Sequence, residues 1–357
     1  MKNILSKIPA SFIGEIIKRK EPCGLCKASK AKKIGKVDYW DIRTSDVVKC
    51  RSCGHIQLDP MLTHDETARG CLAYYIEESL RVNPKEQEKN LLRNFRRGVL
   101  FGNSLKKKGV VPKDILEFGP GSGYFADGIK FIFPETNITV MDVNKEVLEF
   151  NKAHHNYNTI ESSIENFNSD LEDKFDLIIA RDLLEHVIDV DAVINNVMKY
   201  SKDKGLFHFI TPNGHEDVWK HYLRYSQDKT SSELLINHVN YFDGKSLLDL
   251  LKGKNFSAID YYTYKIKTTI KGSGWKKSEK LMATASSKKN SEYYLNKANE
   301  IKENNFIKKE VLDIWYINPK LKIGAFLAAW FNHENLIRVD PKLNVGHEIY
   351  GLFRLGK

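Results

Sequence analysis

The sequence has no apolar run long enough to cross a membrane and no segment typical of a secretion signal. A spanning helix needs roughly 18 consecutive apolar residues, and the longest apolar run, residues 323–331, is far shorter. Residues 1–20 lack the apolar centre and the small-residue cleavage site of a signal peptide. We therefore expect a cytoplasmic protein without a transmembrane segment, and peripheral contact with a membrane surface stays open.

Cysteine is scarce, with five in 357 residues. Cys71 stands alone, whereas the others form two Cys-x-x-Cys pairs, Cys23/Cys26 and Cys50/Cys53. In a cytoplasmic chain such pairs favour a metal over disulfides. Each pair makes a tight turn that brings two thiolates to one ion, and four thiolates close a tetrahedral zinc site with no position for water. The sequence therefore predicts a zinc ion bound by these four cysteines, with a structural role.

Acidic residues are fewer than basic ones, 46 against 56, which gives a net charge of +10. Basic residues are concentrated at residues 27–36 and 265–322. This excess suits an anionic partner, which could be a phosphorylated small substrate, a nucleic acid or a membrane surface. A solvated lysine-rich face explains it equally well, so the charge alone does not choose among them.

Strand-like and helical segments alternate from residue 115 onward. Strands are expected at residues 115–118, 138–142, 159–162, 175–180, 205–210, 256–264 and 349–354. Such alternation is typical of a doubly wound, mostly parallel α/β sheet.

The chain is expected to divide into six parts. These are an amphipathic helix at 1–20, a zinc-binding module at 21–60, a helical linker or lid at 61–112, an α/β core at 113–270, a helical basic insertion at 271–345 and the last strand of the core sheet at 346–357. Thr63 and Glu66 have the spacing of a helix-capping pair. Tyr74 and Tyr75 in the linker either cover a bound ligand or belong to the core.

A glycine-rich turn follows the first core strand, in the sequence Glu117-Phe-Gly119-Pro-Gly121-Ser-Gly123. Glycines permit a sharp turn and let backbone N–H groups approach a ligand, and the helix that follows offers its positive end. Asp142 closes the next strand about 20 residues on, where a carboxylate accepts ribose hydroxyls. The pattern predicts a nucleotide-type cofactor and, taken alone, also suits a nicotinamide dinucleotide.

Further motifs are Leu184-Glu-His-Val187, Thr211-Pro-Asn213 and His238-Val-Asn-Tyr-Phe242. With these, residues 21–264 resemble class I S-adenosylmethionine-dependent methyltransferases, especially a branch with an N-terminal zinc-binding module that occurs in sugar and polysaccharide biosynthesis. The resemblance implies an α/β fold with a doubly wound, seven-stranded, mostly parallel sheet (a Rossmann-like methyltransferase fold), a zinc ribbon before it and a helical insertion near the C-terminus. Residues 349–354 would then run antiparallel between the fifth and sixth strands.

S-adenosylmethionine is the cofactor that this resemblance implies. The glycines would shape the pocket for its methionine part, Asp142 would bind the ribose, Ser163 and Ile164 would flank the adenine, and residues 180–182 would lie beside the sulfonium. The implied cofactor-binding residues are Glu117, Gly119, Gly121, Gly123, Asp142, Val143, Ser163, Ile164 and Arg181.

Methyl transfer needs alignment of donor and acceptor and sometimes removal of a proton. His238 matches a histidine that some sugar C-methyltransferases of this family use near the acceptor, and His215 lies in a loop where substrates often bind. In those enzymes an acidic residue precedes the histidine and a tyrosine lies upstream, whereas this chain has Asn237 and Leu235. His238 and His215 are therefore the catalytic candidates, with oxygen favoured over carbon as acceptor, although both also suit a core or capping histidine.

Asp182, Glu185 and His186 have the spacing that places side chains on one helical turn. They could bind a divalent cation, or they could serve packing and the start of a helix.

The function expected from these motifs is O-methylation of a carbohydrate or a phosphate-bearing sugar, in the biosynthesis of a surface polysaccharide or a glycosylated metabolite. The expected partner is an anionic small molecule, with no stable nucleic-acid complex. The alternative is a zinc-containing RNA methyltransferase, although residues 180–183 lack the Asn-Pro-Pro-Tyr pattern of adenine amino methylation. A non-catalytic cofactor-binding scaffold is a further alternative. The acceptor atom, the oligomeric state and the role of residues 271–345 stay open.

Overall fold

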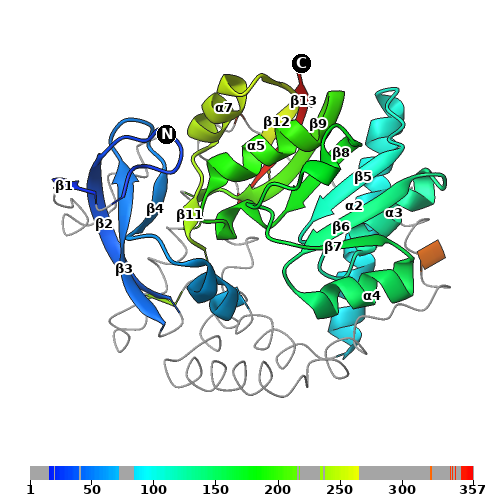
Figure 1. Cartoon of the computed structure of the whole chain (residues 1–357), viewed down its shortest axis with the longest axis horizontal. Helices are drawn as coiled ribbons and strands as arrows, with labels where there is room; N and C mark the ends of the chain where they lie inside the picture. The colour runs from blue at the N-terminus through cyan, green and yellow to red at the C-terminus, as the bar shows by residue number, and fades with distance from the viewer. Residues whose placement is uncertain are drawn as a thin grey trace, which may run out of the picture.

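Two β-sheets organise the part of the chain that the computed structural model describes, as Figure 1 shows. The described residues are 16–19, 21–39, 42–71, 84–214, 217, 234–235, 238–264, 322–323, 338, 340, 342 and 347–356. No helix among them is long and apolar enough to cross a bilayer.

The larger sheet has seven strands in the order β12-β13-β9-β8-β5-β6-β7. Their bounds are β5 Asp114–Phe118, β6 Asn137–Asp142, β7 Asn158–Glu161, β8 Phe175–Arg181, β9 Ser201–Pro212, β12 Phe256–Tyr264 and β13 Glu348–Leu355. β5 to β9 pair in parallel, and β13 pairs antiparallel with both β9 and β12. All seven expected strands are therefore present, and the last strand has the expected antiparallel place between the fifth and sixth.

Helices cover both faces of this sheet. α5 (Val190–Tyr200) and α7 (Gly244–Gly253) pack on one face, and α2 (Pro84–Lys107), α3 (Tyr124–Ile132) and α4 (Lys145–His155) pack on the other. Residues 177–180 of β8 are fully buried because both faces are covered, and this explains their continuous apolar run. The carboxyl ends of the parallel strands share one edge, where ligands bind in folds of this type.

The smaller sheet contains β1 (Ile16–Lys18), β2 (Lys30–Tyr39), β3 (Arg43–Cys50), β4 (Ile56–Asp59) and β11 (Asn240–Tyr241) in that order, and β10 (Leu234–Leu235) also pairs with β2. The hairpin of β2 and β3 forms the excursion between the two cysteine pairs. β10 and β11 come from the second half of the chain, so this sheet is completed by residues far from the N-terminus in sequence. Figure 1 shows β11 between the blue N-terminal strands and the larger sheet.

The helix expected at residues 1–20 is wrong at its C-terminal end. Ile16–Lys18 forms β1, antiparallel to Lys30–Lys32 of β2, and residues 1–15 lie outside the described part. Two consecutive β-branched isoleucines favour an extended backbone when a partner strand is available.

The predicted capping pair is confirmed at the start of the helical segment 64–71. The Thr63 N–H donates to Glu66 Oε2 over 2.8 Å, and the Glu66 N–H donates to Thr63 Oγ1 over 3.3 Å. This reciprocal pair satisfies two of the N–H groups that a helix start leaves free. It orients the helix that leads from the smaller sheet toward the larger one.

Candidate active site

The glycine turn between β5 and α3 contains three residues with left-handed backbone. Gly119, Gly121 and Gly123 have φ angles of 58°, 52° and 71°, a region that side chains disfavour. Added Cβ atoms would meet different surroundings. At Gly119 the Cβ would lie 3.0 Å from Leu183 Cδ1, at Gly123 it would overlap Asn151 Oδ1, and at Gly121 it would have nothing within 4 Å. The turn therefore presents Gly121 toward open space at the edge of the sheet.

Two side chains of α4 form hydrogen bonds to carbonyl groups of this turn. Asn151 Nδ2 donates to the Gly121 carbonyl over 2.9 Å, and His155 Nε2 donates to the Ser122 carbonyl over the same distance. Burial lowers the pKa of His155, which keeps the imidazole neutral in this role. Because its carbonyls are bound, the turn is fixed before any ligand arrives.

Asp142 and Val143 lie at the carboxyl end of β6, the strand next to β5. Burial raises the pKa of the Asp142 carboxyl to about 6, although the N–H groups of Asn144 and Val143 act against this rise. Val143 is 61% exposed, which is unusual for a large apolar side chain. The Asp142 carboxylate can accept hydrogen bonds from hydroxyl groups, and the exposed Val143 side chain beside it can pack against a flat ring.

Ser163 and Ile164 follow β7, the next strand in the sheet. Ser163 Oγ accepts from the Glu165 N–H over 3.3 Å. Ile164 is buried, and Asn196 of α5 donates to its carbonyl over 2.9 Å. These bonds fix the backbone of Ser163 and Ile164 after β7, the strand that lies next to the strand ending at Asp142.

Glu117 and Arg181 lie on neighbouring strands, β5 and β8, close to the glycine turn. Burial raises the pKa of the Glu117 carboxyl to about 8, and the charge of Arg181 opposes this rise. Glu117 Oε2 has no hydrogen-bond partner among the described residues. The Arg181 guanidinium stacks on the Phe125 ring, 4.0 Å from its centroid. A buried carboxyl without a full set of partners is ready to accept hydrogen bonds from a ligand.

A second group of side chains lies beyond β8 and β9. The ligand atoms of Glu185, His186 and His238 lie within 4.8 Å of one another. His238 Nδ1 lies 2.6 Å from Asp217 Oδ2, and Thr211 Oγ1 donates to Glu185 Oε2 over 2.9 Å. The structure thus brings together two motifs that are more than 50 residues apart, Leu-Glu-His-Val and His-Val-Asn-Tyr-Phe.

Opposing effects set the charge of His238. Burial lowers the pKa of its imidazole, but the negative charge of Asp217 and its hydrogen bond outweigh burial, so the pKa lies above the usual 6.5. Burial raises the pKa of the Glu185 carboxyl to about 8, and the charge of His238 limits that rise. A histidine with a carboxylate on Nδ1 can accept a proton at Nε2 near neutral pH.

The glycine turn and the His238 group are adjacent. Leu183 approaches the Gly119 position, and Glu185, two residues on, reaches His238. The segment after β8 therefore forms the wall between them. Asp182 begins this segment with a left-handed φ of 50° and donates its N–H to the Ile210 carbonyl over 2.8 Å. The three-residue turn η4 (Leu184–His186) presents Glu185 and His186. The Asp182 carboxylate is not among the clustered ligand atoms, although its charge helps to raise the pKa of His238.

Sequence reasoning missed two residues of this region. Asp217 gave no signal because a single acid in a long loop has no pattern, and its role depends on how the loop folds toward His238. Cys71 was set aside as unpaired, yet burial raises the pKa of its thiol to about 12, and the charges of Asp142 and Glu185 add to the rise. Cys71, at the end of helix 64–71, is therefore near enough to these two carboxyls to feel their charge. Tyr74, Tyr75 and His215 lie outside the described residues.

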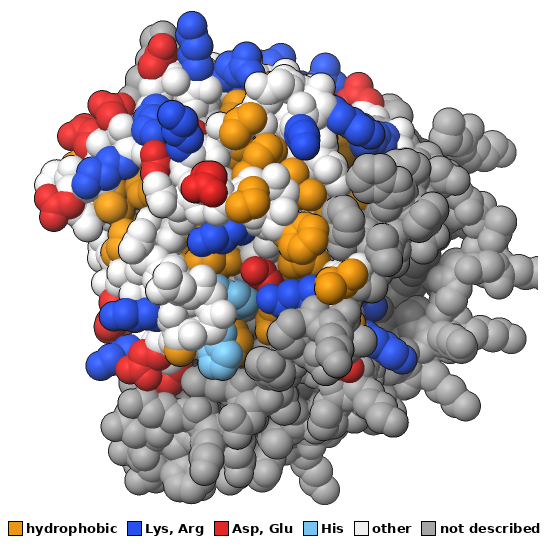
Figure 2. All heavy atoms as spheres, turned by 90° about the vertical axis from the view of Figure 1, so that its right-hand side faces the viewer, with side chains coloured by type: hydrophobic (Ala, Val, Ile, Leu, Met, Phe, Trp, Pro, Cys, Tyr) orange, Lys and Arg blue, Asp and Glu red, His pale blue; other side chains and the backbone are white. Residues whose placement is uncertain are grey.

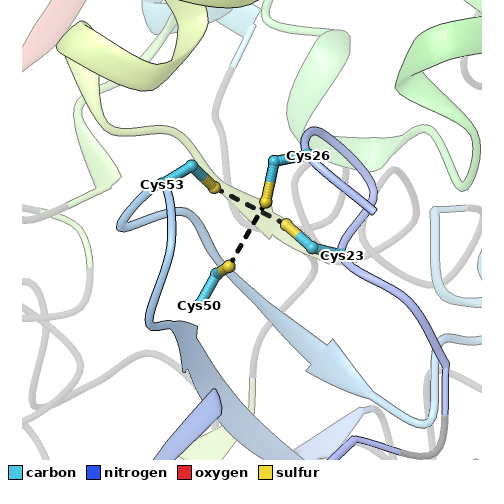
Figure 3. A group of neighbouring side chains, drawn as sticks. All are labelled: Cys23, Cys26, Cys50 and Cys53. Atoms are coloured by element: carbon cyan, nitrogen blue, oxygen red, sulfur yellow. Dashed lines mark hydrogen bonds between the residues drawn. The ribbon is translucent and has the colours of Figure 1, made fainter. Parts of the chain in front are cut away.

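Four cysteine sulfurs converge on one point at the end of the smaller sheet, as Figure 3 shows. The Sγ atoms of Cys23 and Cys53 lie 3.7 Å apart, and those of Cys26 and Cys50 lie 3.5 Å apart. Zinc–sulfur bonds of about 2.3 Å in a tetrahedron place sulfurs about 3.8 Å apart, so the geometry fits zinc.

The close thiols also influence one another's ionisation. A hydrogen bond from Cys53 lowers the pKa of Cys23 to about 3, whereas the same bond raises the pKa of Cys53. One thiol therefore ionises at the expense of its neighbour, and a divalent cation would allow all four to ionise.

Comparison with known proteins supports the interpretation of the larger sheet. Residues 87–261 match the family model described as a methyltransferase domain. The chain is 32% identical over 143 residues to a ribosomal RNA small subunit methyltransferase C of Buchnera aphidicola subsp. Baizongia pistaciae, covering 37% of the chain and 44% of that protein. It is 26% identical over 116 residues to a ubiquinone biosynthesis O-methyltransferase of Proteus mirabilis, covering 31% and 46%. The chain thus spans less than half the length of these two relatives.

Among solved structures, the plantazolicin methyltransferase BpumL in complex with SAH shares 14% identity with a TM-score of 0.43, over 82% of this chain and 97% of that one. The match of residues 87–261 agrees with the strand order β12-β13-β9-β8-β5-β6-β7 and with the glycine turn after β5. Residues 87–261 are therefore similar to methyltransferase domains, and the larger sheet has the seven-stranded, Rossmann-like fold of such domains.

Proposed function

We propose that this protein transfers the methyl group of S-adenosylmethionine to a hydroxyl of a carbohydrate or a phosphate-bearing sugar. The observation that carries the proposal is the glycine turn with open space at Gly121, next to the Asp142 strand, together with the His238–Asp217 pair beyond the Leu183–Glu185 segment. A methyl donor bound at the glycine turn and Asp142, and an acceptor bound at His238, would meet beside Leu183 and Glu185. Methyl transfer depends chiefly on such alignment.

For the cofactor, Asp142 would accept the ribose hydroxyls, and the exposed Val143 and the buried Ile164 would contact the adenine with Ser163. Glu117 Oε2, which has no partner among the described residues, would accept a hydrogen bond from the ammonium group of the methionine part. The positive charge of Arg181 would favour the ionised form of Glu117. When bound, S-adenosylmethionine supplies a methyl carbon activated by positive sulfur. The residues of this chain would then exclude water, orient the acceptor and accept its proton.

For the acceptor, His238 would take the hydroxyl proton at Nε2, because Asp217 occupies Nδ1 over 2.6 Å and stabilises the imidazolium that forms. This role requires a neutral imidazole before the reaction. His215, two residues before Asp217, stays a second candidate from the sequence.

Oxygen is the favoured acceptor atom for two reasons. The motif around His238 departs from the sugar C-methyltransferase pattern at Asn237 and Leu235, and the relatives include O-methyltransferases of ubiquinone biosynthesis and of malonyl-[acyl-carrier protein]. The net charge of +10 suits an anionic acceptor. The carbohydrate class rests on the sequence motifs, and a role in polysaccharide or glycosylated-metabolite synthesis follows from it.

The alternative acceptor is RNA. It is favoured by the similarity to a ribosomal RNA methyltransferase and by the basic charge. On the face shown in Figure 2, however, basic side chains stand among acidic ones over the described residues, so this face shows no single basic surface. RNA binding with a steep dependence on salt would favour this alternative.

Zinc is the second proposed cofactor, bound by Cys23, Cys26, Cys50 and Cys53. Four thiolates leave no open coordination position, so its role would be structural. The metal content of the purified protein, with Cys50→Ser as the control, tests this assignment.

The testing experiment has two stages. Calorimetry with S-adenosylhomocysteine first measures cofactor binding, with Gly121→Trp as the blank because the indole would fill the open space. Labelled S-adenosylmethionine is then supplied with fractionated extract of the source cells. Label in nucleotide sugars or glycans supports the proposal, label in RNA replaces it with the alternative, and no binding of S-adenosylhomocysteine overturns both.

A further inference from the structure

We propose that the four-cysteine module has a task beyond its own folding, namely to hold His238 in position through His55 and Asn240. This inference rests on the proposed function, because it assumes that His238 acts on the acceptor. Two layers of contact carry it, one made by the backbone and one by buried side chains.

The backbone layer joins β11 directly to the module. β11 pairs antiparallel with β4, with Asn240 opposite Gln57 and Tyr241 opposite Ile56. The Leu58 N–H also donates to the Val239 carbonyl over 3.2 Å. The residue that follows His238 is thus bonded to a strand of the module.

β4 is in turn tied to both cysteine pairs. The Cys50 N–H donates to the His55 carbonyl over 2.8 Å, just before β4 begins. The Gly24 N–H, between Cys23 and Cys26, donates to Gln57 Oε1 over 2.8 Å. A change at either cysteine pair therefore reaches the strand on which β11 rests.

The side-chain layer crosses from the module to the methyltransferase domain. His55 is fully buried, and its Nε2 donates to Asn240 Oδ1 over 3.1 Å. Asn240 Nδ2 donates in turn to the Val187 carbonyl over 2.6 Å. Both bonds are shielded from water, so the loss of either would leave a buried polar group without a partner.

The other side of the His238 segment is bonded to the wall of the active site. The Val239 N–H donates to the Glu185 carbonyl over 2.9 Å, and the Glu185 side chain belongs to the His238 group. The segment is therefore held between β4 of the module and the residues after β8. Without the module, β11 would lose the strand with which it pairs, and so short a strand is not stable alone. Only the bonds to Glu185, Val187 and Asp217 would then hold the His238 segment.

Hydrogen exchange tests the inference without a known acceptor. The full chain is compared with and without chelator treatment, and exchange is followed in peptides that cover residues 238–243 and, as a reference, β5. We expect at least roughly tenfold faster exchange at 238–243 in the treated protein with β5 unchanged. Equal protection of 238–243 in both states would overturn the inference.

A substitution separates the connection from the metal. Asn240→Leu removes both side-chain bonds, and Asn196→Leu, which loses a buried bond to the Ile164 carbonyl but none to the module, is the matched control. We expect faster exchange at 238–243 only in Asn240→Leu, with the zinc content unchanged. If the two variants behave alike at 238–243, the link does not hold this segment.

A positioning role also predicts how kinetics change once an accepting fraction is available. His55→Leu should lower kcat roughly tenfold while the affinity for S-adenosylhomocysteine stays unchanged, and His55→Gln, whose amide can donate to Asn240, should recover most of the loss. A loss that His55→Gln does not restore contradicts the inference. Failure of wild-type cofactor binding would instead contradict the proposed function, so the two failures are distinguishable.

Discussion

Asp142 is a carboxyl whose charge changes close to neutral pH. Burial raises its pKa to about 6, so the folded protein takes up a proton there that an exposed aspartate would not. The same shift means that ionisation of Asp142 lowers folding stability as the pH rises from about 4 to about 6. Above that range the carboxylate is charged, as its proposed role toward the ribose hydroxyls requires.

Cofactor affinity should therefore depend on pH below about 6. We expect the Kd for S-adenosylhomocysteine to rise about tenfold for each pH unit below the pKa of Asp142. Calorimetry between pH 5 and 8 measures this. Asp142→Asn should bind more weakly at pH 7 and lose the dependence, and an equally steep dependence in that variant would assign the effect to another group.

His238 should set the pH dependence of methyl transfer. Its pKa lies above 6.5 because the charge of Asp217 outweighs burial, and a general base must be neutral, so kcat should rise with pH through a midpoint above 6.5. Asp217→Asn should move the midpoint down, since the negative charge that raises the pKa is gone. His154→Gln, whose imidazole bonds to its own helix, is the control and should leave the profile unchanged. A profile that Asp217→Asn does not shift would remove Asp217 from the mechanism.

At the scale of single residues, the sequence predicted candidate site residues that lie within motifs and gave no signal for those outside them. Gly119, Gly121 and Gly123 were predictable because only a left-handed turn needs glycine at those positions. His238 was found through its motif, whereas Asp217 became visible only when the loop after β9 brought it 2.6 Å from His238. A pairing between side chains from separate segments has no local periodicity.

Among the elements, α2 and α3 cross where each helix has a glycine. A Cβ on Gly98 would overlap the Phe125 carbonyl, and a Cβ on Gly128 would overlap the Phe95 carbonyl. The neighbours are backbone atoms, which cannot rotate away. α2 thus packs closely on the domain, although it was expected in a linker or lid.

Gly128→Ala should therefore destabilise the protein by roughly 1–3 kcal/mol or more, because the helices must separate. Gly253→Ala at the end of α7 is the matched control. A Cβ there meets nothing within 4 Å, and alanine favours a helix, so that variant should be neutral or slightly more stable. Urea unfolding midpoints at constant slope compare the two, and equal midpoints would show that the helices can separate at little cost.

The long strands were predictable because each is an apolar run separated by helical segments, and their observed ends differ from the expected ends by a few residues. The short strands were not. β1, β10 and β11 have two or three residues each, and their extended backbone depends on partners elsewhere in the chain. Residues 16–18 illustrate the conflict, since their apolar spacing also suited a helix.

The whole molecule links its two sheets through chain connectivity. Residues 240–241 complete the smaller sheet, yet they lie between β9 and β12, two strands of the larger one. The buried bonds from His55 to Asn240 and from Asn240 to Val187 cross the same boundary. Neither sheet can unfold alone without breaking contacts of the other, so we expect the two to unfold together.

Calorimetric unfolding should accordingly show one cooperative transition, and zinc removal should shift it as a whole. An ion present at about 100 times its Kd stabilises the folded state by about 2.7 kcal/mol. At roughly 2–4 °C per kcal/mol for a domain of this size class, the midpoint should fall by about 5 °C or more on chelation. Cys50→Ser should unfold at the lower temperature with or without chelator. Two separate transitions, with only the smaller one sensitive to zinc, would show that the cysteine module and the methyltransferase domain are thermodynamically independent.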